Sequence, residues 1–304
     1  MRALIGPAII VAAASLVVAQ EQGGDQTRQI VAEEFAKARP KASASAAKKT
    51  ATYRVKKASG GQGLSAEAAT AAKADAAELG VTVWRLREQK TPAPDSRLLI
   101  QDESSAVSWV PERIDAQAGL AIGDRVRLAI ESPRAGFLYV LDHEEYADGT
   151  RGPAYLIFPT NRTRSGDNAV RAGRLVEIPA REDRPSYFTV RRSRPDQVAE
   201  VLSAIVSTER IAELPLADRA TEVAAATVSR WETTWGAPTE ELVQVGAANR
   251  AWSESEARAG VEAERLLTQD DPMPQTIYRV RAKAGQPLLV HIRLPYGAST
   301  ATKP

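Results

Sequence analysis

Two short runs of the chain are apolar at every position, which strongly limits how they can fold. They are FLYVL at residues 137–141 and AYLIF at residues 154–158. Successive side chains of a strand point to opposite faces of its sheet, so a strand that is apolar throughout must be covered on both faces. We therefore expect both runs to lie inside a layered β structure.

Other parts of the chain after residue 120 also have strand character. DRVRLAIE, at residues 124–131, alternates cleanly, with Val126, Leu128 and Ile130 on one face and charged residues on the other. Residues 198–207, VAEVLSAIVS, fit either a strand or a helix because they mix β-branched residues with helix formers. Further strands are expected at residues 173–179, 186–190, 276–282 and 287–296.

Helical features appear between these strands. Val228, Trp231 and Trp235 are spaced by three and four residues, so they share one face of a helix that ends at Gly236. A second helix is expected where Ser253 and Glu256 have the spacing of a capping box. The sequence therefore predicts a mainly β fold of the α+β type: an antiparallel β-sandwich with two or three helices covering one face, preceded by a disordered tail.

Composition divides the chain into unequal parts. Residues 1–19 have an early arginine, an apolar run and a small-residue end, which indicates a secretory signal peptide, with an uncleaved membrane anchor as the alternative. Residues 20–79 are rich in Ala and Lys, which predicts a flexible tether with short helices, one of them reaching from Ser65 to Gly80.

The β-rich domain is then expected at residues 80–297, followed by a disordered tail at residues 298–304. It would contain a helical insertion at residues 215–268 and closing strands at residues 275–295. No segment after the signal is apolar enough to span a membrane.

Several motifs between residues 120 and 207 occur in a recognisable order. They are LAIGDRVRLAIES, GFLYVLD, DGT, LIFPT, AGRLVEIP and YFTVRRSRPDQVAEVLSAIVS. In this order and spacing the segment resembles a bacterial family catalogued as domain of unknown function 4384. The resemblance implies an all-β accessory module of exported, envelope or signalling proteins, and it implies no catalytic residue.

The polar stretch DHEEYADGTRG separates the two apolar runs. Its carboxylates, Asp142, Glu144, Glu145 and Asp148, do not have the spacing of a calcium loop. We expect Asp148-Gly149 to be the turn of a β-hairpin and the other charges to be solvated around it. The alternative is a hydrolase that uses paired carboxylates of the Asp142–Asp148 loop.

The histidines, His143 and His291, are expected at the surface; a zinc site would need both to converge with a carboxylate. The chain has no cysteine, which excludes disulfides and cysteine-based zinc sites. It also lacks the G-x-S-x-G, H-E-x-x-H and P-loop motifs.

The best candidate for a binding surface is the loop FPTNRTRSGDNAVRAGR. Arginine guanidinium groups bind carboxylate and phosphate groups in a bidentate manner. The candidate residues are Arg162, Arg164, Asn168, Arg171 and Arg174. The alternative is that these arginines pair with nearby acids, among them Glu177, Glu182, Asp183 and Asp196.

These observations favour a non-catalytic binding or scaffolding protein of the cell envelope that is exported to the periplasm or outside the cell. Its expected partner is an envelope protein or an anionic envelope polymer, and no cofactor is expected. Specific binding of nucleic acid is not expected either, since the basic part of the tether, residues 37–73, has one aromatic residue, Tyr53. A further alternative is a structural subunit of an envelope assembly, whose apolar strands would pack against a partner protein.

Overall fold

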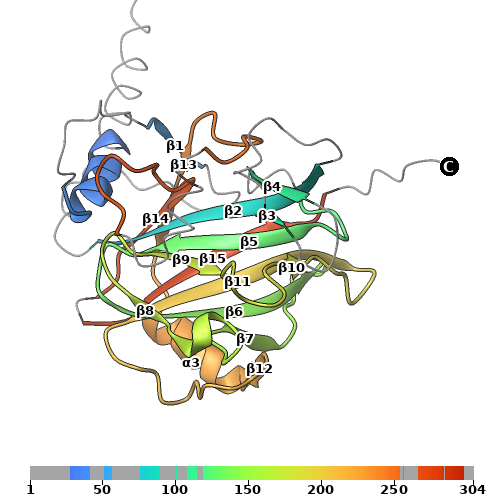
Figure 1. Cartoon of the computed structure of the whole chain (residues 1–304). Coiled ribbons are helices and arrows are strands. Elements are labelled where there is room, and N and C mark those ends of the chain that lie inside the picture. The colour runs from blue at the N-terminus through green and yellow to red at the C-terminus, as the bar shows by residue number, and fades with distance from the viewer. Residues whose placement is uncertain are drawn as a thin grey trace, which may run out of the picture.

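Two stacked antiparallel sheets form the body of the protein (Figure 1). The computed structural model describes residues 28–41, 51–56, 76–89, 100–101, 108–114, 119–253, 256, 266–283 and 285–297. The predicted fold class, a mainly β sandwich with helical additions, is confirmed.

The larger sheet has nine strands among the described residues, in the order β1-β13-β14-β2-β4-β3, with β5 pairing β2, β9 and β10. Its strands are β1 (Tyr53–Val55), β2 (Ala77–Gln89), β3 (Ile100–Gln101), β4 (Ser108–Arg113), β5 (Arg125–Glu131), β9 (Leu175–Ile178), β10 (Phe188–Thr189), β13 (Thr239–Gln244) and β14 (Thr276–Val280).

The smaller sheet has six strands in the described part of the chain, in the order β12-β7-β6-β11-β15, with β8 beside β6. Its strands are β6 (Gly136–Tyr146), β7 (Ala154–Phe158), β8 (Ala169–Val170), β11 (Gln197–Ser207), β12 (Thr221–Val223) and β15 (Leu288–Pro295). Residues 198–207, which fitted either type of element, are therefore a strand.

The main core lies between the two sheets. Leu128 and Ile130 of β5 pack there with Leu138 and Val140 of β6. The alternation predicted for β5 is confirmed, because Arg127 and Glu131 lie on the opposite face of that strand, where they form ion pairs.

The apolar character of β6 and β7 on both faces is explained by the helix α3 (Ala225–Trp235), which covers the outer face of the smaller sheet (Figure 1). Val228 and Trp231 of α3 pack against Tyr139, Leu141 and Leu156. The sheet is thus buried by the other sheet on one side and by α3 on the other, as the sequence predicted.

A second helix, at residues 28–38, packs on the larger sheet, so the described helices do not share one face of the sandwich. Its residues Val31 and Phe35 are buried with Leu242 and Ile277. Arg39, just after the helix, makes a bidentate pair with Glu131 of β5, with N–O distances of 2.7 and 2.6 Å.

The tether predicted for residues 20–79 is therefore wrong where the structure describes it. Residues 28–41, β1 and the start of β2 all belong to the fold, because large side chains such as Phe35 and Tyr53 find apolar partners on distant strands. The helix expected from Ser65 to Gly80 is also wrong at its end, since Ala77–Gly80 pair with β14. The remainder of this segment lies outside the described residues.

The insertion at residues 215–268 is only partly helical, because it contributes β12 and β13 as well as α3. The helix expected after Ser253 lies mostly outside the described residues. The side chain of Glu256 nevertheless accepts from the Ser253 amide at 2.6 Å, and the Ser253 hydroxyl accepts from the Glu256 amide at 3.3 Å, as a capping box requires.

The predicted signal peptide at residues 1–19 and the tail at residues 298–304 lie outside the described residues as well. Within the part of the chain that is described, neither helix combines the length and the apolar character needed to cross a bilayer.

Candidate functional site

The predicted arginine loop connects β7 to β9 and is held tightly at its base. Thr163 Oγ1 accepts from the Thr160 amide at 2.8 Å. Arg164, Ser165 and Gly166 have φ angles of 50°, 52° and 79°, so three consecutive residues form a left-handed turn. Asp183 then fixes this turn, because its Oδ1 accepts from the Arg164 amide at 3.0 Å.

Arg164 is a buried arginine of this loop that has no close carboxylate. Its side chain is only 9% exposed, and its nearest ion-pair oxygen, on Asp167, is 3.8 Å away, which is too long for a hydrogen bond. No acceptor among the described residues reaches its buried Nε. Burial lowers the pKa of the Arg164 guanidinium, and the charge of Arg174 lowers it further.

Asp167 is already occupied by a second arginine. The Nη2 of Arg174 lies 2.6 Å from Asp167 Oδ2, while the other oxygen of Asp167 accepts from the Ala169 amide. Two guanidinium groups therefore converge on one carboxylate. Glu182 and Asp183 also lie near enough to act on Arg164, but the oxygens of Asp183 are engaged by the amides of Arg164 and Ala180.

The other three predicted residues differ in their surroundings. Arg162 and Arg171 are exposed and form no ion pair with the described residues. Asn168 is fully buried; it donates to the Leu138 carbonyl at 3.0 Å and accepts from Arg210 at 3.2 Å. The structure thus gathers Arg164 and Arg174 around Asp167, leaves Arg162 and Arg171 in solvent and uses Asn168 to hold the loop on β6.

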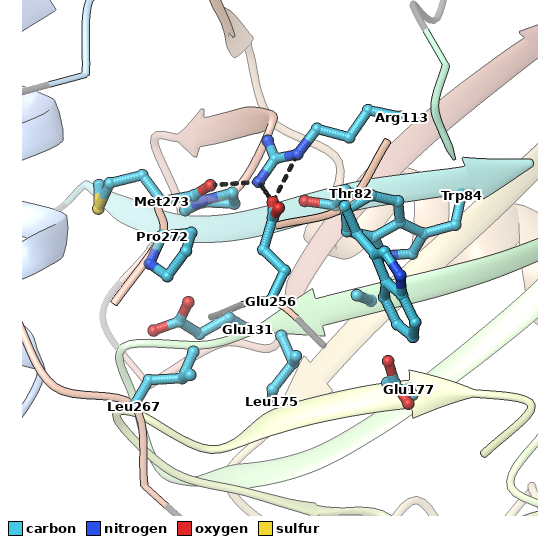
Figure 2. Close-up of a pocket in the computed structure, with 13 residues that line it drawn as sticks. Thr82, Trp84, Arg113, Glu131, Leu175, Glu177, Glu256, Leu267, Pro272 and Met273 are labelled. Atoms are coloured by element: carbon cyan, nitrogen blue, oxygen red, sulfur yellow. Dashed lines mark hydrogen bonds and ion pairs between the residues drawn. The ribbon is translucent and has the colours of Figure 1, made fainter. Parts of the chain in front are cut away.

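A cavity lies on the outer face of the larger sheet, lined by Trp84 of β2 and Glu131 of β5 on one side and by Leu267 and Met273 on the other (Figure 2). Its volume is about 40 Å³, which holds a few water molecules but is far below the several hundred Å³ typical of ligand pockets. Trp84 and Trp252 form its aromatic wall, with ring centroids 6.1 Å apart.

The charged groups around this cavity are already paired. Figure 2 shows Arg113 bound to Glu256 and to the Met273 carbonyl. Glu131 pairs with Arg39, and Glu177 pairs with Arg127. Because every charged residue that lines the cavity is paired, we interpret the cavity as a small packing gap between the larger sheet and the residues that lie over it.

The polar stretch after β6 is not the loop that the sequence predicted. Asp142, His143, Glu144 and Glu145 belong to β6 and pair with β11, so only residues 147–153 remain as the connection to β7. The prediction of the turn itself is confirmed, because Gly149 has a φ of 82° and its amide donates to the Tyr146 carbonyl.

This correction changes the surroundings of the carboxylates. Burial raises the pKa of Asp142 to about 6, and the charge of Glu144 contributes to the shift. Burial also raises the pKa of Glu200 to about 8, and the charge of Asp142 adds to it. The sequence analysis missed Glu200; its one signal was a lone acid within the apolar run VAEVLSAIVS.

The two histidines lie on the outer face of the smaller sheet. His143 is 5% exposed, so the expectation of a surface histidine is wrong for it. Ser203 Oγ lies 2.9 Å from His291 Nδ1, and His291 Nε2 lies 3.7 Å from Glu232. Ser203, His291 and Glu232 therefore lie in a row. Ser203 is not an accessible nucleophile, however, because it is 2% exposed in the middle of β11. Among the described residues no group of His, Asp and Glu is placed to hold a metal ion.

The fold and these sites define a β-sandwich module in which charged groups are mostly paired. Residues 119–210 match the model of the family described as "Domain of unknown function (DUF4384)", so this segment is similar to that family. The match runs from just before β5 to just after β11, so the matched segment contributes strands to both sheets. No curated protein and no solved structure matches the chain.

Proposed function

We propose that the protein is an exported binding protein of the cell envelope that holds an anionic envelope polymer at the arginine loop. The observation that carries this proposal is the state of Arg164, a guanidinium with its side chain 9% exposed and its nearest carboxylate 3.8 Å away. A buried cation is expensive to leave without a close anion. A phosphate or carboxylate group of a polymer would supply that anion.

The surrounding loop supports this function. Arg162 and Arg171 are exposed and add positive charge that is not used in ion pairs with the described residues. A polymer that contacts several arginines releases its bound counterions, so its affinity falls with rising salt. The loop is also held in place by Thr163 and Asp183, which lowers the entropy lost on binding.

The binding test uses the full chain with fluorescently labelled polyphosphate as the anionic probe and neutral dextran as the reference polymer. We expect polyphosphate to bind at low salt and dextran not to bind. The double variant Arg164→Gln/Arg174→Gln should bind polyphosphate at least tenfold more weakly, because it removes both guanidinium groups around Asp167.

The matched control is Arg87→Gln, on β2 of the other sheet, where the arginine is exposed beside Glu112. It removes one positive charge but leaves the loop intact, so its affinity should stay within about twofold of the wild type. If Arg87→Gln weakened binding as much per charge removed as the loop double variant does, only net charge would matter, and the proposed site would be wrong.

Export is the second part of the proposal, and it rests on the apolar run and small-residue end of residues 1–19. Cell fractionation tests it with the full chain and with a chain that starts at Gln20. The full chain should be found outside the cytoplasm, and the shortened chain inside it. Cytoplasmic full-length protein would contradict export.

A further inference from the structure

Three carboxyl groups meet on one face of the smaller sheet. β6 and β11 pair antiparallel, with Glu144 opposite Glu200 and Asp142 opposite Leu202. Asp142, Glu144 and Glu200 therefore continue the inward-facing rows that place Leu138, Val140, Ala204 and Val206 in the core. Like charges directly opposite each other on neighbouring strands are destabilising, so this arrangement needs an explanation.

Asp142 and Glu200 act on each other within this cluster, since the charge of Asp142 raises the pKa of Glu200. Asp142 Oδ1 and Glu200 Oε2 are both buried, and no donor from the described residues reaches either atom. Two ionised carboxylates can only accept, so these two groups can satisfy each other only when one of them carries a proton.

Glu200 also anchors the segment that follows β10. Gln197 Nε2 donates to Glu200 Oε1 at 2.9 Å, while Gln197 Oε1 accepts from the Ser193 amide at 2.9 Å. The Tyr296 hydroxyl lies 2.5 Å from Glu200 Oε1 and 2.7 Å from the Arg191 carbonyl. Because a hydroxyl carries one proton, Tyr296 donates either to Glu200 or to the Arg191 carbonyl at a time, whereas Gln197 links Glu200 to the Ser193 amide without such a choice.

The remaining charged groups around the pair do not neutralise it. Tyr146 donates to Glu144 Oε2 at 2.7 Å. Arg192 lies over the ring of Tyr296, and Arg194 lies over the ring of Tyr146 and pairs with Asp196. On the other face of the same strands, Arg293 pairs with Glu145. None of these arginines forms a described ion pair with Asp142 or Glu200.

We propose that Asp142 and Glu200 bind a proton between them, and that this proton holds residues 191–197 against the end of the sandwich. We call this proton-dependent attachment of residues 191–197 the clasp. With the proton in place, Glu200 is neutral, donates to Asp142 and accepts from Gln197, and the Tyr296 hydroxyl donates to the Arg191 carbonyl. When the proton leaves, up to three adjacent carboxylates repel one another across β6 and β11. The ionised Glu200 is also the stronger acceptor, so it takes the single Tyr296 proton away from the Arg191 carbonyl, and residues 191–193 lose that hydrogen bond.

The direction of the pH dependence follows from the raised pKa values of both groups. Burial raises the pKa of Asp142 to about 6 and that of Glu200 to about 8. The folded chain therefore binds protons that the unfolded chain has already lost. The clasp is complete below about pH 4, weakens as pH rises through the two folded pKa values, and is open above about pH 8.

The main test is amide hydrogen exchange on the full chain at pH 5.5 and pH 9, corrected for intrinsic exchange rates. We expect protection in residues 191–197 to fall about tenfold in the wild type between these values. Glu200→Gln keeps a neutral side chain of the same shape, and its protection should change less than twofold. An equal fall in both proteins would overturn the proposal, and so would no fall in the wild type.

Glu78→Gln serves as the matched control, because burial also raises the pKa of Glu78, to about 7, in β2 of the other sheet. This variant should retain the tenfold fall in residues 191–197, and loss of that fall would contradict the assignment to Glu200. A measurement that needs no variant is the ¹³C titration of the Glu200 carboxyl. A midpoint near that of an ordinary glutamate would overturn the proposal.

Discussion

The arginine loop and the end of the smaller sheet carry opposite charge imbalances, and the chemistry of the side chains makes them behave differently. At the loop, Arg164 and Arg174 share one carboxylate, Asp167. At the end of the sheet, Asp142 and Glu200 lie together without a cation. A carboxyl group relieves the repulsion between like charges by taking up a proton, whereas a guanidinium cannot lose its proton near neutral pH.

This difference predicts different dependencies for the two regions. The carboxyl pair should respond to pH and be largely indifferent to added anions. The arginine loop should respond to anions and salt and be indifferent to pH over the range in which arginine stays charged.

The largest effect is expected from Glu131→Gln, which removes the carboxylate that binds Arg39. The side chains of this pair are 1% and 3% exposed. Losing the carboxylate leaves the buried Arg39 guanidinium with backbone carbonyls as its acceptors among the described residues and its charge no longer balanced by Glu131, so the free energy of unfolding should fall by about 3–5 kcal/mol. Urea unfolding measures it. Glu213→Gln, which removes the exposed partner of Arg230, is the control and should cost less than about 1 kcal/mol; equal losses would contradict the account.

The next effect concerns the pH dependence of stability. Because the folded pKa values of Asp142 and Glu200 are raised, the wild type should lose stability between pH 5 and pH 9. Glu200→Gln should lose about 2 kcal/mol less over this range, a value below the full pKa shift because the carboxyl is only half-buried. Urea unfolding at several pH values measures this. Parallel curves for the two proteins would show that Glu200 is not the titrating group.

His143 should act in the opposite direction. Burial lowers its pKa, and the charge of Arg151 lowers it further. The folded chain therefore binds fewer protons here than the unfolded chain, so this contribution to stability is present at neutral pH and is lost as pH falls below about 6.5. His143→Gln should reduce the loss between pH 7 and pH 5 by about 1 kcal/mol, measured by urea unfolding. If the variant lost as much stability as the wild type between pH 7 and pH 5, His143 would not be the titrating group.

The smallest effect is expected from Asp167→Asn. The variant keeps the oxygen that accepts from the Ala169 amide but removes the negative charge that occupies Arg174. Because Asp167 competes with an incoming anion, the affinity for polyphosphate should rise about threefold, or roughly 0.6 kcal/mol. Fluorescence polarisation measures this. Weaker binding would show that Asp167 orients the arginines for the ligand and does not compete with it.

Local patterns were sufficient to predict the layered part of the fold. The apolar runs at residues 137–141 and 154–158 indicated strands covered on both sides, and the spacing of Val228 and Trp231 indicated the helix that covers them. The turn at Asp148-Gly149 was also predictable, because it depends on neighbouring residues alone. Each of these features is encoded within about a dozen residues.

Features that depend on distant pairing were not predictable in this way. Phe35 and Tyr53 join the fold because β13 and β14, far later in the chain, supply Leu242 and Ile277. Glu144 meets Glu200 through the register of β6 and β11, and no local pattern states that register. For the arginine loop the sequence supplied the residue types, but the convergence of Arg164 and Arg174 on Asp167 became visible only in the structure.

The most direct test of the proposed function is the salt dependence of polyphosphate binding. Plotting the logarithm of the affinity against the logarithm of the salt concentration gives a slope that reports how many polymer charges the protein neutralises. Relative to the wild type, Arg164→Gln/Arg174→Gln should reduce this slope by about 1.4, at about 0.7 for each lost contact to a flexible polyanion. An unchanged slope in that variant would show that the two arginines do not touch the polymer.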